Sequence, residues 1–326
     1  MKKRNYIIEL LRLFFAIEIV ALHSSPLAEV NGFISYFCSQ TISRLGVPFF
    51  SAVAGYFFFG GAKKKNYDKY LKRYIFIYSF WSCLMLIYDA ILWNDSSTLL
   101  VVHIFKTFFL LGWHQLWYLL GIIYLLLILL LLNNLTDRAN EIVFKMSFIF
   151  LAWGICIDNY GNIFRKISFF NIVYQYDANM ISGFITIIIP FFMMGYLLNK
   201  PISESLIRHS LGATLSCLVG LLIEIFITTV FDLHQSVALC LFTYPTVFFL
   251  LVWSLKSTKE KNANGIIAKY AGKMASAIYF IHYLPIVMLY NSGVTETPTF
   301  LISCGISIVI GFILIIQKNN YIKKIL

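Results

Sequence analysis

The sequence predicts an all-α, polytopic membrane protein with about ten transmembrane helices around an internal polar cavity. Hydrophobic types make up 60% of its 326 residues and charged types only 13%, whereas soluble domains have roughly 45–50% apolar and about 25% charged residues. The apolar residues form long runs, and a helix needs about 20 such residues in a row to span a bilayer. The composition therefore excludes a soluble globular protein and a disordered chain.

Ten segments are long and apolar enough to span a bilayer. They cover residues 6–28, 33–60, 73–93, 115–133, 141–158, 180–199, 207–230, 236–255, 270–290 and 298–317. A shorter apolar stretch, 98–112, contains His103 and Lys106, which favours a helix lying in the membrane interface. If this stretch spanned the bilayer, the count would be eleven and the C-terminus would change sides. The first segment is interrupted by charged residues, so we expect it to be retained rather than cleaved as a signal peptide.

The basic residues predict the orientation of the helices. With the N-terminus inside, 21 of the 26 Lys and Arg residues fall in cytoplasmic segments, three fall outside, and Arg12 and Arg44 lie within the membrane. Such an excess on one side is typical of cytoplasmic loops, so both termini are expected in the cytoplasm. The net charge of +11 thus records orientation. It does not indicate a nucleic-acid partner, which would need basic residues spread over a polar surface.

No linker or soluble module separates the segments. We therefore expect residues 1–326 to form a single integral membrane domain with no soluble catalytic domain. The six cysteines are scattered singly and form no CxxC pair, so neither a metal site nor a disulfide framework is predicted.

The first helix carries four residues that are costly inside a membrane: Glu9, Arg12, Glu18 and His23. Charged groups in this setting are functional candidates because each costs about 2.5–3.5 kcal/mol at the bilayer centre. Arg12 and His23 are eleven residues apart, which places them on one helix face, roughly 16 Å apart along the axis. Glu9 can pair with Arg12 at i,i+3 spacing. In the alternative interpretation, Arg12 and Glu9 form a structural ion pair and His23 caps the helix end.

Other helices contribute polar groups to the same predicted cavity. Arg44 lies about eleven residues into the second segment, before Gly46 and Pro48, a combination that can open the backbone beside a cavity. Glu224 and His282 come from two later segments, and His282 can also be read as a satisfied core histidine. The remaining histidines lie near interfaces and are expected to be bystanders: His103, His114, His209 and His234.

Four segments resemble, in order, the motifs of the acyltransferase 3 family of ten-helix membrane proteins. They are Glu9-Leu10-Leu11-Arg12 with His23 after ten residues, Arg44-Leu45-Gly46-Val47-Pro48-Phe49-Phe50 with Ala54-Gly55-Tyr56, His114-Gln115-Leu116-Trp117-Tyr118, and Ser276-Ala277-Ile278-Tyr279-Phe280-Ile281-His282. Two positions depart from the family pattern. Ala54 stands where the family often has Ser, and Lys69, Lys72 and Arg73 stand where two arginines are usual.

One branch of the family is the membrane part of the VanT-type serine racemases. His23-Ser24-Ser25-Pro26-Leu27 is similar to that branch, as is Glu224 upstream of Tyr244-Pro245-Thr246. The soluble racemase domain of that branch has no counterpart in this sequence. In that branch the membrane part is thought to carry serine across the membrane.

The resemblance implies a membrane-bound O-acyltransferase in a bacterial cell membrane. The donor would be cytoplasmic acyl-CoA, with acetyl-CoA as the default, and the acceptor a hydroxyl, commonly on a cell-surface glycan. No tightly bound cofactor is implied. Lys69, Lys72 and Arg73, with the Lys63–Lys65 run, form a basic patch able to receive the CoA phosphates. The alternative is that this patch is ordinary positive-inside charge.

Each charged residue then has an expected role. Arg12 would orient the donor, His23 would act as general base on the hydroxyl, and Arg44 would stabilise the oxyanion. The remaining cavity residues are expected to line the substrate site: Glu9, Glu18, Glu224, Tyr279 and His282.

Two other classes of function are compatible with the same residues. In a transporter for a small zwitterion such as L-serine, Arg12 or Arg44 would hold the carboxylate and Glu18 or Glu224 the amine. In a scaffold protein of the membrane, the charges would form structural ion pairs. A monomer of ten helices can enclose a cavity, and a homo-oligomer is compatible with the same sequence.

Overall fold

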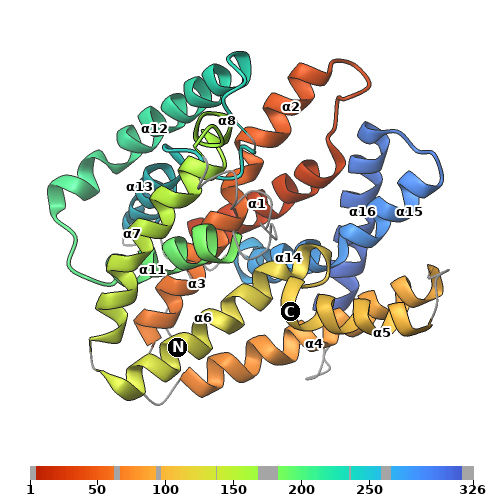
Figure 1. The fold of residues 1–326 in the computed structure, drawn as a ribbon, viewed down its shortest axis with the longest axis horizontal. Coiled ribbons are helices and arrows are strands. Elements are labelled where there is room, and N and C mark those ends of the chain that lie inside the picture. The colour runs from red at the N-terminus through yellow and green to blue at the C-terminus, as the bar shows by residue number, and fades with distance from the viewer. Residues whose placement is uncertain are drawn as a thin grey trace.

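The computed structural model describes residues 5–61, 67–92, 97–136, 138–167, 183–234, 236–257 and 266–317. These residues form helices joined by turns, without a strand among them, as the composition predicts. Helix α1 (Tyr6–Ser24) lies near the centre of the bundle in Figure 1 and packs against helices from both halves of the chain, including α3, α13, α14 and α16. Side chains on α1 can therefore reach the interior of the bundle.

The later elements follow in chain order. They are α2 (Gly32–Thr41), η1 (Ser43–Leu45), α3 (Gly46–Gly61), α4 (Tyr67–Leu92), α5 (Ser97–Lys106), η3 (Thr107–Leu111), η4 (His114–Leu116), α6 (Trp117–Leu135), α7 (Ala139–Ile157), α8 (Gly161–Phe164), η5 (Phe184–Ile188), α11 (Ile189–Leu198), α12 (Glu204–Val230), α13 (Thr243–Ser257), α14 (Ile266–Ile281), α15 (Tyr283–Asn291) and α16 (Glu296–Ile316).

Each of the ten predicted segments contains one helix or consecutive helices, but the helix in segment 236–255 begins only at Thr243, and that in segment 6–28 ends at Ser24. Within the described ranges, seven helices are long and apolar enough to cross a membrane, and two shorter apolar helices cover Phe184–Leu198 and Thr243–Leu255. Helix α1 has 19 residues, among them the charged Glu9, Arg12 and Glu18. Together these helices indicate a multi-pass membrane protein, whereas the cytoplasmic position of the termini stays a prediction.

The stretch 98–112 forms α5 and η3 in direct succession and ends at Gly112, whose φ of 78° requires glycine. Tyr78 of α4 donates a hydrogen bond to the carbonyl of Phe108 over 2.7 Å, and Tyr124 of α6 donates to that of Phe109. Two neighbouring helices therefore hold η3, and the location of this stretch in the interface stays a prediction.

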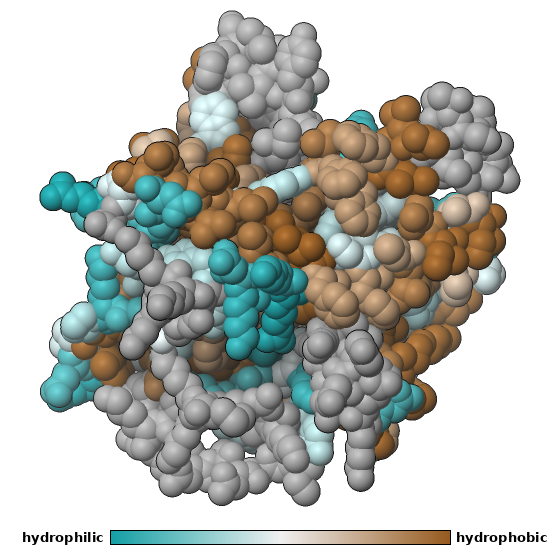
Figure 2. Space-filling model, turned by 90° about the horizontal axis from the view of Figure 1, so that it is seen from below, coloured by the Kyte–Doolittle hydropathy of each residue, from teal (hydrophilic) through white to brown (hydrophobic). Residues whose placement is uncertain are grey.

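Helix α16 has the polarity expected of a helix that faces lipid. Thr299, Ser303 and Ser307 are fully buried, whereas Val309 and Phe312 are exposed. Small residues facing other helices and large apolar residues facing outward are typical of membrane helices. Figure 2 shows the same property on one face of the molecule, where hydrophobic side chains cover a broad area beside a group of hydrophilic ones.

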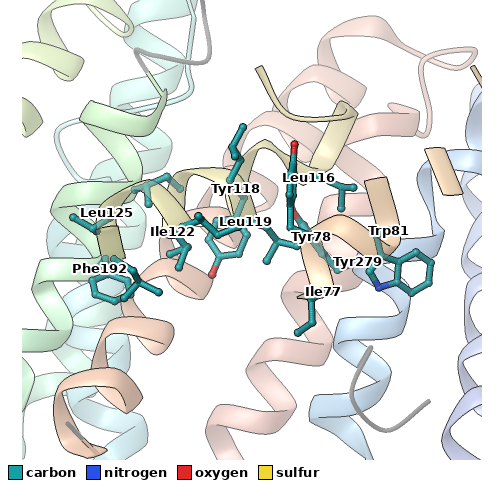
Figure 3. Packing of buried hydrophobic residues seen from close by; sticks show 14 of the residues in the cluster. Ile77, Tyr78, Trp81, Leu116, Tyr118, Leu119, Ile122, Leu125, Phe192 and Tyr279 are labelled. Carbon is teal, nitrogen blue, oxygen red and sulfur yellow. The ribbon is translucent and has the colours of Figure 1, made fainter. Parts of the chain in front are cut away.

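Close packing fixes the helices that carry the site. A Cβ atom on Gly55 of α3 would overlap the backbone of Phe192 in α11, and one on Gly195 would overlap the backbone of Gly55. The two helices thus cross with their backbones in contact. Beside them, a hydrophobic cluster joins α4, α6, α11 and α14 (Figure 3), and Trp81 stacks on Phe280 with ring centroids 5.0 Å apart. This cluster holds the last turn of α14 in place.

Candidate active site

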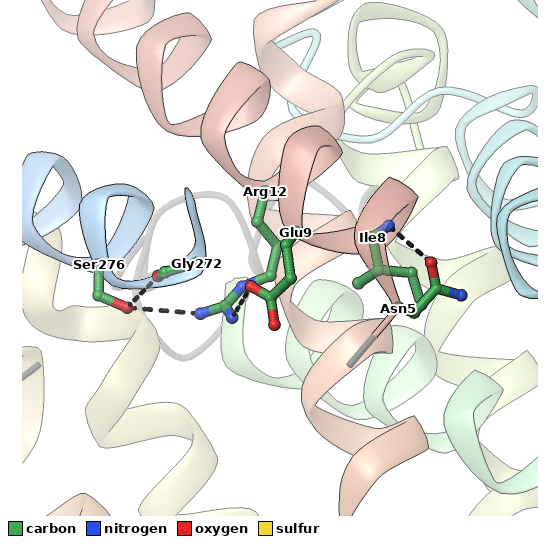
Figure 4. A network of polar contacts seen from close by, with 6 residues as sticks. All are labelled: Asn5, Ile8, Glu9, Arg12, Gly272 and Ser276. Atoms are coloured by element: carbon green, nitrogen blue, oxygen red, sulfur yellow. Dashed lines mark hydrogen bonds and ion pairs between the residues drawn. The ribbon is translucent and has the colours of Figure 1, made fainter. Parts of the chain in front are cut away.

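The N-terminal half of α1 carries an ion pair in a small polar network, shown in Figure 4. Arg12 Nη1 lies 3.0 Å from Glu9 Oε2, which confirms the predicted i,i+3 pair. Arg12 Nη2 donates to Ser276 Oγ of α14 over 3.4 Å, and that hydroxyl donates to the carbonyl of Gly272 over 3.1 Å. A Cβ atom on Gly272 would overlap the Glu9 carboxylate. Glycine is therefore required where α14 approaches the ion pair.

The basic residues of α4 lie toward the same end of the bundle as Arg12, which we call the Arg12 end. Lys69, Lys72 and Arg73 are exposed on the first turns of α4. Tyr74, next to them, is within electrostatic reach of both Arg73 and Arg12. The Lys63–Lys65 part of the predicted patch lies outside the described residues.

The opposite end of α1 brings two histidines together, and we call it the His23 end. His23, in the last turn of α1, is exposed, whereas His282 is fully buried. Their ring centroids are 5.4 Å apart, with an interplanar angle of 32°. His282 Nδ1 lies 3.0 Å from the carbonyl oxygen of Ile278. Because a carbonyl can only accept, Nδ1 carries the proton and Nε2 keeps a free lone pair.

His114 belongs to the same cluster, although its place near an interface in the sequence predicts a bystander. Its ring stacks on that of Tyr283 with centroids 4.3 Å apart, and its Nε2 lies 3.5 Å from Asp89 Oδ1. Tyr283 in turn meets His23 edge-on at 5.9 Å. His114 has a φ of 42°, in the left-handed region that a residue with a side chain rarely adopts. Strained backbone of this kind is often found at functional sites.

Gln115 fastens η4 to the last turn of α14. Its Nε2 donates to the carbonyl of Phe280 over 3.1 Å, and the hydroxyl of Tyr279 donates to the Gln115 carbonyl. Helix α14 ends at Ile281 and α15 begins at Tyr283, so His282 sits at the break between them. The two bonds of Gln115 hold the turn immediately before this break.

Aromatic side chains connect the two ends inside the bundle. Tyr118 is within electrostatic reach of Arg12, and its ring lies 5.9 Å from that of Tyr279. The Tyr279 ring lies 6.3 Å from that of His282. Tyr118 and Tyr279 therefore form a chain of neighbouring rings that leads from Arg12 to His282, beside His23.

Arg44 lies at a helix break, as the sequence predicts. It is part of η1, between the end of α2 at Thr41 and the start of α3 at Gly46. Its Nε donates to Gln40 Oε1 over 2.8 Å, and its charge is within electrostatic reach of His23. The neighbouring Ser43 donates to Glu18 Oε2 over 2.8 Å. Glu18 thus binds the turn that presents Arg44.

Glu224 occupies a separate polar cluster at the start of α13. Its carboxylate accepts hydrogen bonds from Asn159 Nδ2 (2.6 Å), the Tyr160 hydroxyl (3.2 Å), and the backbone amides of Leu241 (2.8 Å) and Phe242 (3.1 Å). Burial and the adjacent Glu224 raise the pKa of Tyr160 to about 12, so this phenol keeps the proton that it donates. Four donors satisfy the buried carboxylate without a cation.

The structure therefore places both His282 and Arg44 close enough to His23 to act on its charge. Glu224 instead lies in the separate cluster with Asn159 and Tyr160. Sequence reasoning missed three residues that the fold adds: Asp89, His114 and Gln115. The segment His114–Tyr118 was recognised as a motif, but its contacts depend on η4 meeting the end of α14. Among the residues that the structure describes, no group of three or more His, Cys, Asp or Glu side chains could hold a metal ion.

Comparison with known proteins gives two matches. The family model described as an acyltransferase domain matches residues 5–316. A protein of Enterococcus faecalis named amino-acid racemase is 25% identical over 324 residues, covering 89% of this chain and 42% of that protein. The chain thus spans less than half the length of that relative. No solved structure matches the chain.

Proposed function

The chain belongs to the acyltransferase 3 family, and on that premise we propose that it transfers an acyl group, acetyl by default, from cytoplasmic acyl-CoA to a hydroxyl of a cell-surface glycan or a related acceptor. The observation that carries this proposal is the ring of His23, an exposed residue, 5.4 Å from the ring of the buried His282. An accessible imidazole is the commonest general base for a hydroxyl. The whole reaction would take place within this single membrane domain.

The donor would enter at the Arg12 end, in the cytoplasm. Exposed Lys69, Lys72 and Arg73 offer positive charge to the CoA phosphates, and Arg73 can bind one with two parallel hydrogen bonds. Arg12, whose side chain is 25% exposed, would orient the arm of the donor where it enters the bundle. The phenols of Tyr118 and Tyr279 would line its path toward His23.

The chemistry would follow at the His23 end. The acceptor hydroxyl attacks the thioester carbonyl carbon, forming a C–O bond while its proton passes to His23. Arg44 stabilises the oxyanion of the tetrahedral intermediate. The C–S bond then breaks, and the proton passes from His23 to the leaving thiolate. Acyl ester and CoA are the products, and no other co-reactant is needed.

A transporter for a small amino acid such as L-serine is the second candidate. Its support is the resemblance to the VanT-type branch, and the similarity to a protein named amino-acid racemase agrees with that resemblance. Against it, the two carboxylates assigned to the amine already have other partners. Glu224 accepts from four donors, and Glu18 accepts from Ser43.

The test compares purified protein in two assays. In detergent or nanodiscs, we expect release of CoA from acetyl-CoA when a hydroxyl acceptor from the bacterial envelope is present, and loss of that release in His23→Ala. In proteoliposomes, we expect no uptake of labelled L-serine. Serine uptake without CoA release would contradict acyl transfer and establish the transporter instead.

A further inference from the structure

We propose that His282 is a positioning residue for His23. Its Nε2 accepts the N–H of the His23 ring and so turns the other ring nitrogen of His23 toward the acceptor hydroxyl. This inference rests on the proposed acyl transfer. It adds that the base, His23, is oriented by a second histidine.

The tautomer of His282 is fixed by its own helix. Nδ1 donates to the carbonyl of Ile278, four residues earlier, over 3.0 Å. Nε2 is then an acceptor that needs a proton donor. Within the described part of the chain, this buried Nε2 has no hydrogen-bond partner. A buried polar atom without a partner costs free energy, and native structures rarely retain one without a reason.

The ring next to this nitrogen is that of His23. The centroid separation of 5.4 Å and the angle of 32° allow a small rotation of either ring to bring two nitrogens into hydrogen-bond distance. The exposed His23 is the ring that can turn, because His282 is fully buried and anchored at Nδ1. A neutral imidazole has one N–H and one lone pair. Donating to His282 therefore leaves the lone pair of His23 for the substrate.

The surroundings keep His282 in this orientation. Gln115 bonds to Phe280 and Tyr279 in the turn before it, and the ring of Tyr279 packs 6.3 Å away. A base held by a third group, which is held in turn by the fold, is the usual arrangement in nucleophilic catalysis. In this site, the carbonyl of Ile278 would orient His282, and His282 would orient His23.

The proton balance assigns different roles to the two rings. His23 gains the proton of the acceptor hydroxyl as the C–O bond forms and returns it to the thiolate as the C–S bond breaks. His282 remains neutral throughout and only accepts a hydrogen bond. Arg44 and His114 also act on His23; the positive charge of Arg44 disfavours a lasting charge on His23 and so favours return of the proton to the thiolate.

Steady-state kinetics test the pairing. We expect His282→Leu to lower kcat about 100-fold with little change in the KM for acyl-CoA, and His282→Gln to recover part of this loss because its amide oxygen can accept. In a His23→Ala background, His282→Leu should cause no further loss of kcat, because the effects of residues that act as a unit are not additive.

His209→Leu is the matched control: His209 also bonds a carbonyl four residues earlier, over 2.9 Å, but is exposed on α12. It should retain the kcat of the parent protein.

The pairing would be overturned if folded His282→Leu kept the kcat of the parent protein. It would also be overturned if the fold-losses in kcat of the His23→Ala and His282→Leu variants multiplied in the double variant. Either result would leave acyl transfer intact. Absence of turnover in the parent protein would instead contradict the proposed function. If the parent protein shows no turnover, or if His282→Leu fails to fold, nitrogen-15 NMR of labelled histidines still tests the pairing. We expect a neutral ring with Nδ1 protonated for His282, and a His23 spectrum that changes in His282→Gln. A proton on Nε2 of His282 would refute the inference.

Discussion

The two ends of α1 differ in how their polar groups are satisfied. At the Arg12 end, Glu9, Arg12, Ser276 and the Gly272 carbonyl form a continuous set of hydrogen bonds. At the His23 end, the buried Nε2 of His282 has no partner in the described residues, and the neighbouring His23 ring is exposed. The first arrangement holds two helices together and presents one cation. In the second, the lone pair of His282 can accept from His23, which leaves the lone pair of His23 for proton transfer.

This difference indicates a division of labour along the helix. A residue that is already paired, such as Arg12, can bind acyl-CoA through the N–H groups that its partners leave free. A base such as His23, whose free lone pair faces the substrate while a neighbour orients its ring, can react without first breaking a hydrogen bond. The comparison thus predicts that donor affinity depends on one end and chemical rate on the other.

Sidedness should give the largest effect. If the Arg12 end faces the cytoplasm, acyl-CoA, which does not cross membranes, should support turnover in sealed inside-out vesicles and not in right-side-out vesicles. The measurement is CoA release before and after permeabilisation, which should equalise the two preparations. Turnover confined to right-side-out vesicles would reverse the assignment of the two ends.

Gly272→Ala should have the next largest effect. The added methyl group overlaps the Glu9 carboxylate and meets Arg12 Nη1 at 2.9 Å, so the ion pair or α14 must move. We expect a loss of about 1–3 kcal/mol in stability and a higher KM for acyl-CoA, measured by thermal unfolding and kinetics.

Gly212→Ala provides the matched control for that change. Gly212 lies on α12, and a Cβ there would meet nothing within 4 Å. Alanine in a helix is roughly 0.5–1 kcal/mol more favourable than glycine, so this variant should be as stable as the parent or slightly more so. Equal effects of the two substitutions would show that Gly272 is not required for close approach.

Glu29→Gln should have the smallest effect, and that effect should depend on pH. Glu29 accepts from the backbone N–H of Thr297 over 2.6 Å and from its hydroxyl over 2.8 Å. The backbone hydrogen bond from Thr297 holds the pKa of Glu29 below its usual value. The hydrogen bonds between Glu29 and Thr297 fix the turn that follows His23, in which Leu27 has a φ of 70°.

Because folding lowers this pKa, the stabilisation by Glu29 is complete above its unfolded pKa, near 4.3, and is lost as the pH falls through the folded value. Unfolding midpoints of the parent and Glu29→Gln should therefore differ slightly at pH 7 and converge toward pH 3. A difference that is constant across this range would contradict the role of the charge.

Much of this arrangement was predictable from the sequence. The apolar runs locate the helices, although not all of their ends, and the i,i+3 spacing gives the Glu9–Arg12 pair, because run length and helical periodicity are local properties. The break at Arg44 follows from Gly46 and Pro48. These features are local, and local geometry follows from local sequence.

The remainder depends on tertiary contacts between distant segments. His114 looked like an interface residue because its partners, Asp89 and Tyr283, come from other helices. Glu224 looked like a cavity residue because nothing near it in sequence shows that the backbone at Leu241 and Phe242 folds back onto it. The free nitrogen of His282 is visible only once its bond to Ile278 and its burial are known.

One comparison of kinetic constants tests the division between the two ends most directly. Arg12→Lys keeps a positive charge beside Glu9 but loses the planar fork of the guanidinium. It should raise the KM for acyl-CoA about tenfold, equivalent to roughly 1.4 kcal/mol of binding, with kcat little changed. His23→Ala should lower kcat by about 100-fold or more and leave that KM unchanged. The reverse pattern, or both variants altering the same constant, would contradict the division.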